Sequence, residues 1–349
     1  MKGIIAEYEE AALQVTDSLE LPEPSTNQIL VKSIYTAINP VDHMMVNMGI
    51  LVESWPFVPG CDAAGIVVKV GGEQAASKFS VGDEVCGCTR LGMKGYSTCQ
   101  EFFLMDADLT IPKPKNLSLA EAATIGVGVE TAALGIFKGC AIPLPDPDNL
   151  PAPKNEWAVV LGGASTVGRF GIQLFKLLGY KVIASCGTRS FETVKQTGAD
   201  VVFDYKIPTT EQISETLSVL NETRGNLHYV LDAAAGGFEF GRALFKELPD
   251  GVAKYFATTN DWSGITDFEG GKSDCIKLGL IGRDSGTEVN DALVAYIPVL
   301  ARLFQLGQLV PAPYVEIGNG GFDAVLEALQ YQKTGAAGSK KVVVQVQDR

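Results

Sequence analysis

Seven small residues from Gly162 to Gly168 (GGASTVG) separate a short apolar run from an amphipathic one. The apolar run Ala158–Leu161 predicts a strand, and the amphipathic run predicts a helix that ends at Gly179. Small residues let the backbone approach phosphate oxygens, and N–H groups at a helix N-terminus donate to them. In G-x-x-G-x-x-G spacing Gly162 and Gly168 fit, and Ser165 holds the middle position. The turn indicates a dinucleotide site, with a plain strand–helix turn as the alternative.

The second predicted strand, Lys181–Cys186, leads into a polar loop that contains Thr188, Arg189 and Ser190. Proteins selective for NAD usually end this strand with a carboxylate that binds the ribose 2′-OH, and none occurs here before Glu192. A guanidinium binds phosphate in a fork, so Arg189 between two hydroxyls favours NADPH over NADH. The alternative is a polar loop that only begins the next helix.

Length and charge limit the class of protein. A chain of 349 residues suggests two domains and a large core. The net charge of -13 argues against nucleic acid and against anionic membranes as partners. No apolar run approaches the roughly 20 residues that span a bilayer, and MKGIIAEYEE lacks the apolar core of a signal peptide. We therefore expect a soluble, cytoplasmic protein.

The cysteines and histidines predict no metal site. Seven cysteines, an odd number, indicate free thiols in a cytosolic chain. Cys86, Cys88 and Cys99 match the paired ligand spacing of structural zinc poorly. With only His43 and His228, a histidine-rich metal site is ruled out, and the lack of a G-x-S-x-G motif disfavours a serine triad.

Two motifs mark the N-terminal third: P-G-x-D-x-A-G-x-V-x-x-V-G from Pro59 to Gly71, and F-x-x-G-D-x-V-x-G from Phe79 to Gly87. With the glycine turn further along the chain, they resemble the medium-chain dehydrogenase/reductase superfamily. The resemblance implies an α/β fold with a GroES-like, β-rich catalytic domain at 1–135 and 297–349. A Rossmann domain with a doubly wound parallel sheet would occupy 136–296.

The same region resembles the zinc-free branch of that superfamily. Gly60-Cys61-Asp62 replaces the G-H-E motif that supplies a zinc ligand in the related alcohol dehydrogenases, and Asn39-Pro40-x-Asp42 is similar to quinone oxidoreductases. We expect no catalytic zinc. Without a Lewis acid to polarise a carbonyl oxygen, reduction of an activated C=C bond is favoured over carbonyl reduction.

A proline-rich segment narrows the resemblance. Five of the eleven residues from 143 to 153 are proline, which predicts a stiff, extended surface segment, and a simple interdomain linker is the alternative. Its L-P-x-P pattern resembles the fungal trans-acting enoyl reductases. That family implies NADPH-dependent reduction of a carrier-bound enoyl thioester, with a polyketide synthase or PKS-NRPS as partner and a monomer favoured over a dimer. An NADPH quinone or free-enone reductase, and a non-catalytic NADPH-binding protein, are the alternatives.

The resemblance also implies roles for individual residues. Cofactor contacts would come from Val41, Asp42, His43, Met44, Ser165, Thr166, Val167, Gly168, Thr188, Arg189, Ser190, Tyr205, Lys341 and Val342. The substrate would lie along Ile125, Gly126, Val127, Gly128, Val129, Glu130, Thr131 and Ala132. Met44 stands where a relative has lysine, and Gly126 where proline is common. The proton donor is unassigned: His43 titrates in the right range, and water or a backbone-lined path is equally open.

Overall fold

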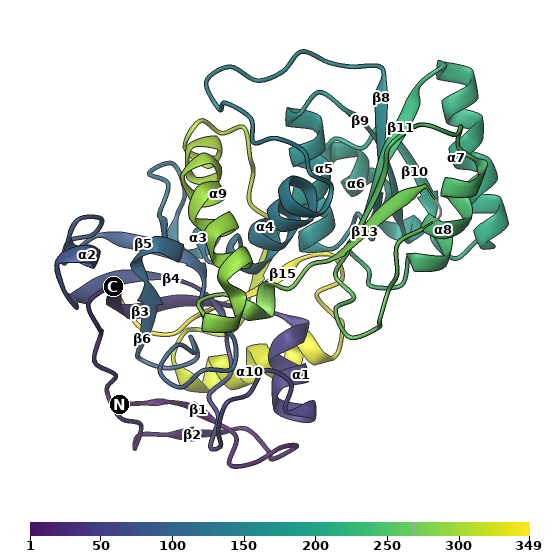
Figure 1. The fold of residues 1–349 in the computed structure, drawn as a ribbon. Helices are drawn as coiled ribbons and strands as arrows, with labels where there is room; N and C mark the ends of the chain where they lie inside the picture. Colours follow the sequence, from purple (N-terminus) through teal and green to yellow (C-terminus); the bar gives the residue numbers. More distant parts are fainter. Residues whose placement is uncertain (269) are drawn as a thin grey trace. The chain divides into compact units, whose positions relative to one another are not determined.

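The computed structural model describes residues 1–268 and 270–349 (Figure 1). By its internal contacts the chain divides into two compact units. Unit 1 comprises Met1–Val127 and Gly279–Arg349, and unit 2 comprises Gly128–Leu278. The first is rich in antiparallel strands and the second is built on a parallel sheet, so the expected α/β fold class is confirmed. The predicted domain limits at 135/136 and 296/297 stay a prediction.

Unit 2 contains a sheet of six strands, which pair in parallel throughout. In spatial order the strands are β10 (Val201–Asp204), β9 (Lys181–Cys186), β8 (Glu156–Leu161), β11 (Asn226–Asp232), β12 (Lys254–Thr258) and β13 (Gly271–Cys275). Because all six run the same way, their carboxyl ends share one edge, where such sheets bind ligands. Strand β12 begins only at Lys254, because Gly251 shortly before it is in a turn with φ +77°.

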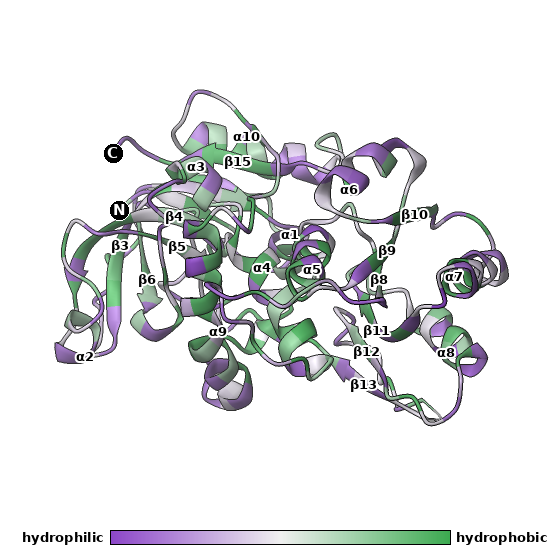
Figure 2. Cartoon of the chain, turned by 90° about the horizontal axis from the view of Figure 1, so that it is seen from above, coloured by the Kyte–Doolittle hydropathy of each residue, from purple (hydrophilic) through white to green (hydrophobic). Residues whose placement is uncertain are grey.

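Unit 2 contains both amphipathic helices and helices that are buried on nearly all sides. They are α4 (Gly126–Ala133, which begins in unit 1), the π-helix η2 (Leu134–Gly139), α5 (Thr166–Leu177), the 3-10 turn η3 (Thr188–Ser190), α6 (Phe191–Thr197), α7 (Thr209–Thr223) and α8 (Phe238–Glu247). In α8, Phe240, Leu244 and Phe245 are buried, and Figure 2 shows hydrophobic and hydrophilic residues on this one helix. The proline-rich segment 143–153 forms neither a helix nor a strand, apart from a single bridge between Asp146 and Asn149.

Unit 1 is organised around the long strand β3 (Gln28–Ile38), whose neighbours run antiparallel to it. The order in the sheet is β14 (Tyr314–Glu316), β15 (Lys341–Gln345), β3, β4 (Asp62–Val70), β5 (Glu84–Cys88) and β7 (Ile111–Pro112), with β6 (Phe102–Asp106) also on β3; β1 (Gly3–Ile5) and β2 (Gln14–Thr16) pair separately. Ile29, Val31 and Phe103 are fully buried in one of its cores.

Helices cover parts of unit 1. They are α1 (Pro40–Met48), α2 (Glu73–Ala76), η1 (Ala107–Leu109), α3 (Leu119–Ala122), η5 (Asp284–Gly286), α9 (Thr287–Gln305) and α10 (Phe322–Lys333), and η4 (Leu278–Leu280) lies at the change of unit. Helix α10 buries Val325, Ala328 and Leu329 on one face. Among the helices of residues 1–268 and 270–349, none has the length and apolar character that a membrane span requires.

Candidate cofactor site and buried polar network

The glycine turn between β8 and α5 is as tight as its sequence predicts. Gly162 has φ +74°, a conformation that side chains other than glycine rarely adopt. A Cβ added to Gly168 would collide with the carbonyl oxygen of Gly162. Ser165 caps α5 by accepting a hydrogen bond from the Gly168 N–H at 3.0 Å. The helix therefore begins directly above the strand end, in the geometry that binds a phosphate at a helix N-terminus.

The turn is tied to the neighbouring strand β9 through Ser185. The Ser185 Oγ accepts from the Gly162 N–H at 3.0 Å, and its carbonyl accepts from the Gly163 N–H at 2.7 Å. Ser185 is almost fully buried. Ser185 was not among the predicted site residues. Its polar side chain within the apolar run from Val182 to Cys186 could have indicated a role. Ser185 therefore fixes the backbone of the glycine turn.

The predicted 2′-phosphate loop lies at the end of β9, beside the end of β10. Thr188, Arg189 and Ser190 form the short helical turn η3, and Thr188 and Arg189 are exposed. Pairing of Asp204 with Cys186 aligns the two strand ends, and the Tyr205 N–H donates to the Cys186 carbonyl at 3.3 Å. Tyr205 itself is 56% exposed. The structure thus gathers these four predicted residues at one corner of the sheet edge.

A second loop at this edge follows β11 and touches the glycine turn. The buried Asp232 accepts from the N–H groups of Ala234 at 3.1 Å and Gly237 at 2.8 Å, and from the Thr258 hydroxyl at 2.8 Å. A Cβ added to Gly162 would contact Ala234. Asp232 thereby holds the loop against the turn, which was not predicted.

Unit 1 contains a cluster of charged and polar side chains, all 5% exposed or less: Asn39, Asp42, Asp62 and Lys341, called here the Asp62 network. The Lys341 ammonium donates to Asp62 at 2.8 Å and to the side-chain oxygen of Asn39. Asn39 in turn donates to Asp62 at 3.0 Å. The remaining Asp62 oxygen accepts from the Val127 N–H at 2.7 Å. Asp62 therefore joins the C-terminal strand β15 to the start of α4.

Asp42 completes the network through backbone groups. Its two oxygens accept from the N–H of Asn39 at 2.7 Å and the N–H of Gly60 at 3.2 Å. Burial is the main cause that raises the pKa of Asp42 to about 6, and the neighbouring Asp62 charge adds to the rise. Both Asp42 and Lys341 were predicted to contact the cofactor, and the structure gives each of them partners within unit 1. Their contact with a cofactor stays a prediction.

His43 points a partly buried ring toward helix α10. Burial is the first cause that lowers its pKa, and the charge of Lys333 adds to the effect. The Leu329 backbone and the Gln332 side chain oppose this lowering of the pKa, and the ring's Nε2 has no hydrogen-bond partner among the described residues. A lowered pKa reduces the protonated fraction of His43 at neutral pH. Its neighbours Val41 and Met44 are partly exposed.

The predicted substrate stretch, residues 125–132, forms the end of the turn before α4 and most of α4 itself. Ile125–Val127 belong to unit 1 and the remainder to unit 2. All of these residues are buried except Val127, which is partly exposed. A Cβ on Gly126 would collide with the backbone of Gly87 and with Asp62. Glycine at position 126, where proline is common in the related proteins, therefore allows a close approach between the helix start and β5.

Among the described residues, all but position 269, no three His, Cys, Asp or Glu side chains are arranged to hold a metal ion. Cys61 and Cys88 share a side-chain hydrogen bond, and this contact with burial raises the pKa of the Cys61 thiol well above its ordinary value. The Cys61 thiol is therefore protonated at neutral pH. Val342, another predicted cofactor residue, is buried in an apolar core beside Val325.

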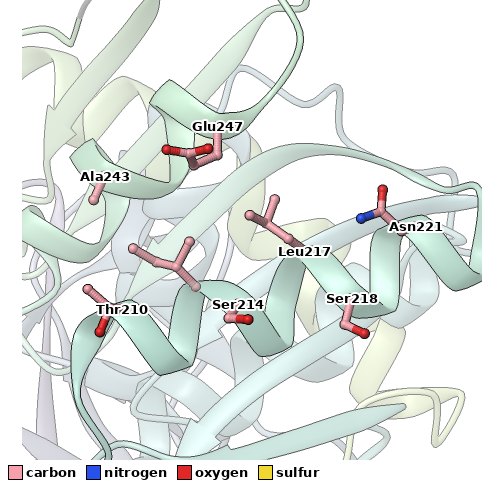
Figure 3. A pocket seen from close by; sticks show the side chains of 8 residues that line it. Thr210, Ser214, Leu217, Ser218, Asn221, Ala243 and Glu247 are labelled. Atoms are coloured by element: carbon pink, nitrogen blue, oxygen red, sulfur yellow. The ribbon is translucent and has the colours of Figure 1, made fainter.

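A pocket of about 560 Å³ lies on unit 2 between α7 and α8 (Figure 3). Its lining consists of Thr210, Ile213, Ser214, Leu217, Ser218, Asn221, Ala243 and Glu247. None of the predicted cofactor or substrate residues is among them.

Comparison with known proteins agrees with this fold. The alcohol dehydrogenase GroES-like domain model matches residues 25–115. The solved structure of JamJ enoyl reductase in its apo form superposes with a TM-score of 0.76 at 20% identity, over 99% of both chains. Together with the parallel sheet of unit 2, these matches define the fold as that of a medium-chain dehydrogenase/reductase.

Full-length relatives define the family within that fold. The chain is 31% identical to Trans-enoyl reductase RAP2 of Pyricularia oryzae, over 98% of each chain. It is 28% identical to the enoyl reductase component lovC of the lovastatin nonaketide synthase of Aspergillus terreus, over 97% of each chain. The chain belongs to the trans-enoyl reductase family, which confirms the family expected from the sequence motifs.

Proposed function

We propose that this protein is a trans-acting enoyl reductase. It uses NADPH to reduce the α,β-double bond of a polyketide enoyl thioester held on a carrier protein. The observation that carries the proposal is the similarity to a named trans-enoyl reductase over 98% of both chains. Because the similarity is not confined to the cofactor-binding half, it supports a shared reaction as well as a shared fold.

The residues of unit 2 fit a phosphorylated dinucleotide. The turn from Gly162 to Gly168 leaves no room for a Cβ at Gly168 and leads directly into the N-terminus of α5, whose N–H groups suit a pyrophosphate. Ser165, Thr166, Val167 and Gly168 would hold that group. Thr188, Arg189, Ser190 and Tyr205 would hold the 2′-phosphate and adenine end, since no carboxylate follows β9 there. From unit 1, Val41, Asp42, His43, Met44, Lys341 and Val342 remain proposed contacts.

The reaction is a conjugate reduction. When bound, the nicotinamide supplies the hydride that forms the new C–H bond at the β-carbon. The C=C electrons move toward the thioester oxygen, so the site must present donors to that oxygen. The α-carbon then takes a proton, for which His43, water and a backbone-lined path are the candidates. Residues 125–132 would line the acyl chain, and Asp62 would position them by holding the Val127 N–H.

The partner that fits this function is a polyketide synthase or PKS-NRPS whose carrier protein delivers the substrate. With a net charge of -13, the chain does not attract acidic carrier proteins as a whole, so docking would use a local surface. We propose a monomer in the cytoplasm.

The test is NADPH oxidation with crotonyl- or 2-hexenoyl-pantetheine thioester, measured beside a simple quinone. Turnover of the thioester without quinone turnover supports the proposal. Fast NADPH oxidation with the quinone and none with the thioester would contradict the proposal and indicate a detoxifying quinone reductase. No turnover of either, despite tight NADPH binding, would indicate a non-catalytic binding protein.

A further inference from the structure

Arg169 is a buried arginine at the start of α5, directly after the glycine turn. It is 4% exposed. Its Nε donates to the Ala164 carbonyl at 3.3 Å, and one terminal nitrogen donates to the Thr197 hydroxyl at 3.2 Å. The other terminal nitrogen is buried and has no hydrogen-bond partner in the described structure. One terminal nitrogen of Arg169 is therefore available to a further acceptor, as far as the described residues show.

The guanidinium also lacks a balancing charge among the described residues. Burial lowers the pKa of Arg169, and among residues 1–268 and 270–349 the Cys186 thiol is the group that opposes this effect. Burial raises the pKa of that thiol to about 11, so it is neutral at pH 7 and supplies no countercharge. A buried cation is costly unless an anion pairs with it. No described residue therefore supplies an anion that pairs with the Arg169 guanidinium.

The surroundings of Arg169 point to one part of the sheet edge. Ala164 lies in the glycine turn, Cys186 ends β9, and Thr197 ends α6, the helix that follows β9. These partners place the guanidinium on the side of the turn that faces the β9–α6 connection. In dinucleotide-binding sheets the end of the second strand is where the adenosine ribose and its 2′ substituent are recognised.

We propose that Arg169 supplies the buried positive charge that favours a cofactor with a 2′-phosphate. This inference rests on the proposed NADPH-dependent function and adds a residue to its cofactor selectivity. Arg169 is a positioning residue: it acts from beneath the loop, through its charge and through its hydrogen bond to Ala164. Arg189, which is exposed, would contact the 2′-phosphate directly. Arg169, which is buried, would attract the phosphate through its positive charge. A charge in a low-dielectric interior is screened less than one at the surface.

The experiment measures binding without turnover. NADPH and NADH are titrated separately, by cofactor fluorescence, into the wild type and the variants Arg169→Met and Arg169→Lys. For Arg169→Met we expect NADPH to bind roughly tenfold to a hundredfold more weakly, because charge-assisted hydrogen bonds are the strong ones. NADH affinity should change less than about threefold, and lysine should restore part of the preference. Arg242→Met, an exposed arginine of α8 paired with Glu239, is the matched control.

Each outcome decides the inference. Equal weakening of both cofactors would overturn it, because the charge would then serve the pyrophosphate or the fold. Unchanged binding of both in Arg169→Met would also overturn it. If Arg169→Met does not fold, Arg169→Lys provides the test. The inference is overturned when this variant keeps the wild-type preference for NADPH and the preference does not change with salt concentration. Failure of the proposed function looks different, since the wild type itself would then not bind NADPH.

Discussion

Two groups of buried charge in this chain differ in how they are balanced. The Asp62 network of unit 1 pairs Lys341 with Asp62 and fills the other oxygens with N–H groups from Asn39, Gly60 and Val127. Arg169 in unit 2 has two hydrogen-bond partners, and its third donor has none among the described residues. A network satisfied by the chain itself is a means of holding elements together. A buried cation without a counterion among the described residues is stabilised when an anionic ligand binds nearby.

The largest effect should come from breaking the satisfied network. Lys341→Met leaves Asp62 buried without its cation, which we expect to lower the free energy of unfolding by about 3–5 kcal/mol. Urea unfolding measures the loss. Lys340→Met, at the exposed neighbouring position, should change it by less than about 0.5 kcal/mol. A Lys341→Met protein as stable as the wild type would mean that the network does not hold unit 1 together.

The network should also give unit 1 a pH dependence. Burial favours the protonated form of Asp42, whose pKa is raised from 3.8 to about 6. Its contribution to stability is therefore fully present below pH 4 and is lost as the pH rises through 6, by about 3 kcal/mol at pH 7. Asp42→Asn should remove this dependence from urea unfolding measured between pH 4 and 7. Exposed Asp17→Asn should keep the wild-type profile, and identical profiles for both variants would refute the assignment to Asp42.

A substitution in the glycine turn of unit 2 should lower the affinity for the cofactor as well as the stability of the protein. Gly168→Ala places a methyl group against the Gly162 carbonyl, so the turn must open. We expect a loss of about 1–3 kcal/mol in the free energy of unfolding, with NADPH affinity at least roughly tenfold weaker because the N–H groups are displaced. Gly264→Ala, in open space, is the control. Unchanged NADPH titrations would show that the turn is not the phosphate site.

The smallest effect should come from the support of that turn. Ser185→Ala removes the acceptor of the part-buried Gly162 N–H, at an expected cost of about 1–2 kcal/mol. Thermal unfolding of Ser185→Ala and of the exposed Ser214→Ala measures the difference. If both variants unfold at the wild-type temperature, the Ser185 bond contributes nothing to the turn.

The sequence was sufficient for features that are local in the chain. The strand, turn and helix around Gly162–Gly168 follow from apolar runs and small residues within about 20 positions, and Ser165 caps α5 as its residue type allows. The Asp62 network could not be predicted in this way, because Lys341 and Asp62 are 279 residues apart. Arg169 was missed for another reason. An arginine in an amphipathic helix ordinarily reaches solvent, and only the packing shows that this one does not.

The most direct test of the account is the fate of a deuterium carried at the transferable position of NADPH. The wild type is incubated with 2-hexenoyl-pantetheine thioester, and the product is analysed by mass spectrometry and NMR. We predict a saturated thioester with one deuterium at the β-carbon and a proton from water at the α-carbon. Deuterium found at a carbonyl carbon, or no saturated product while NADPH is oxidised by a quinone, would contradict enoyl reduction.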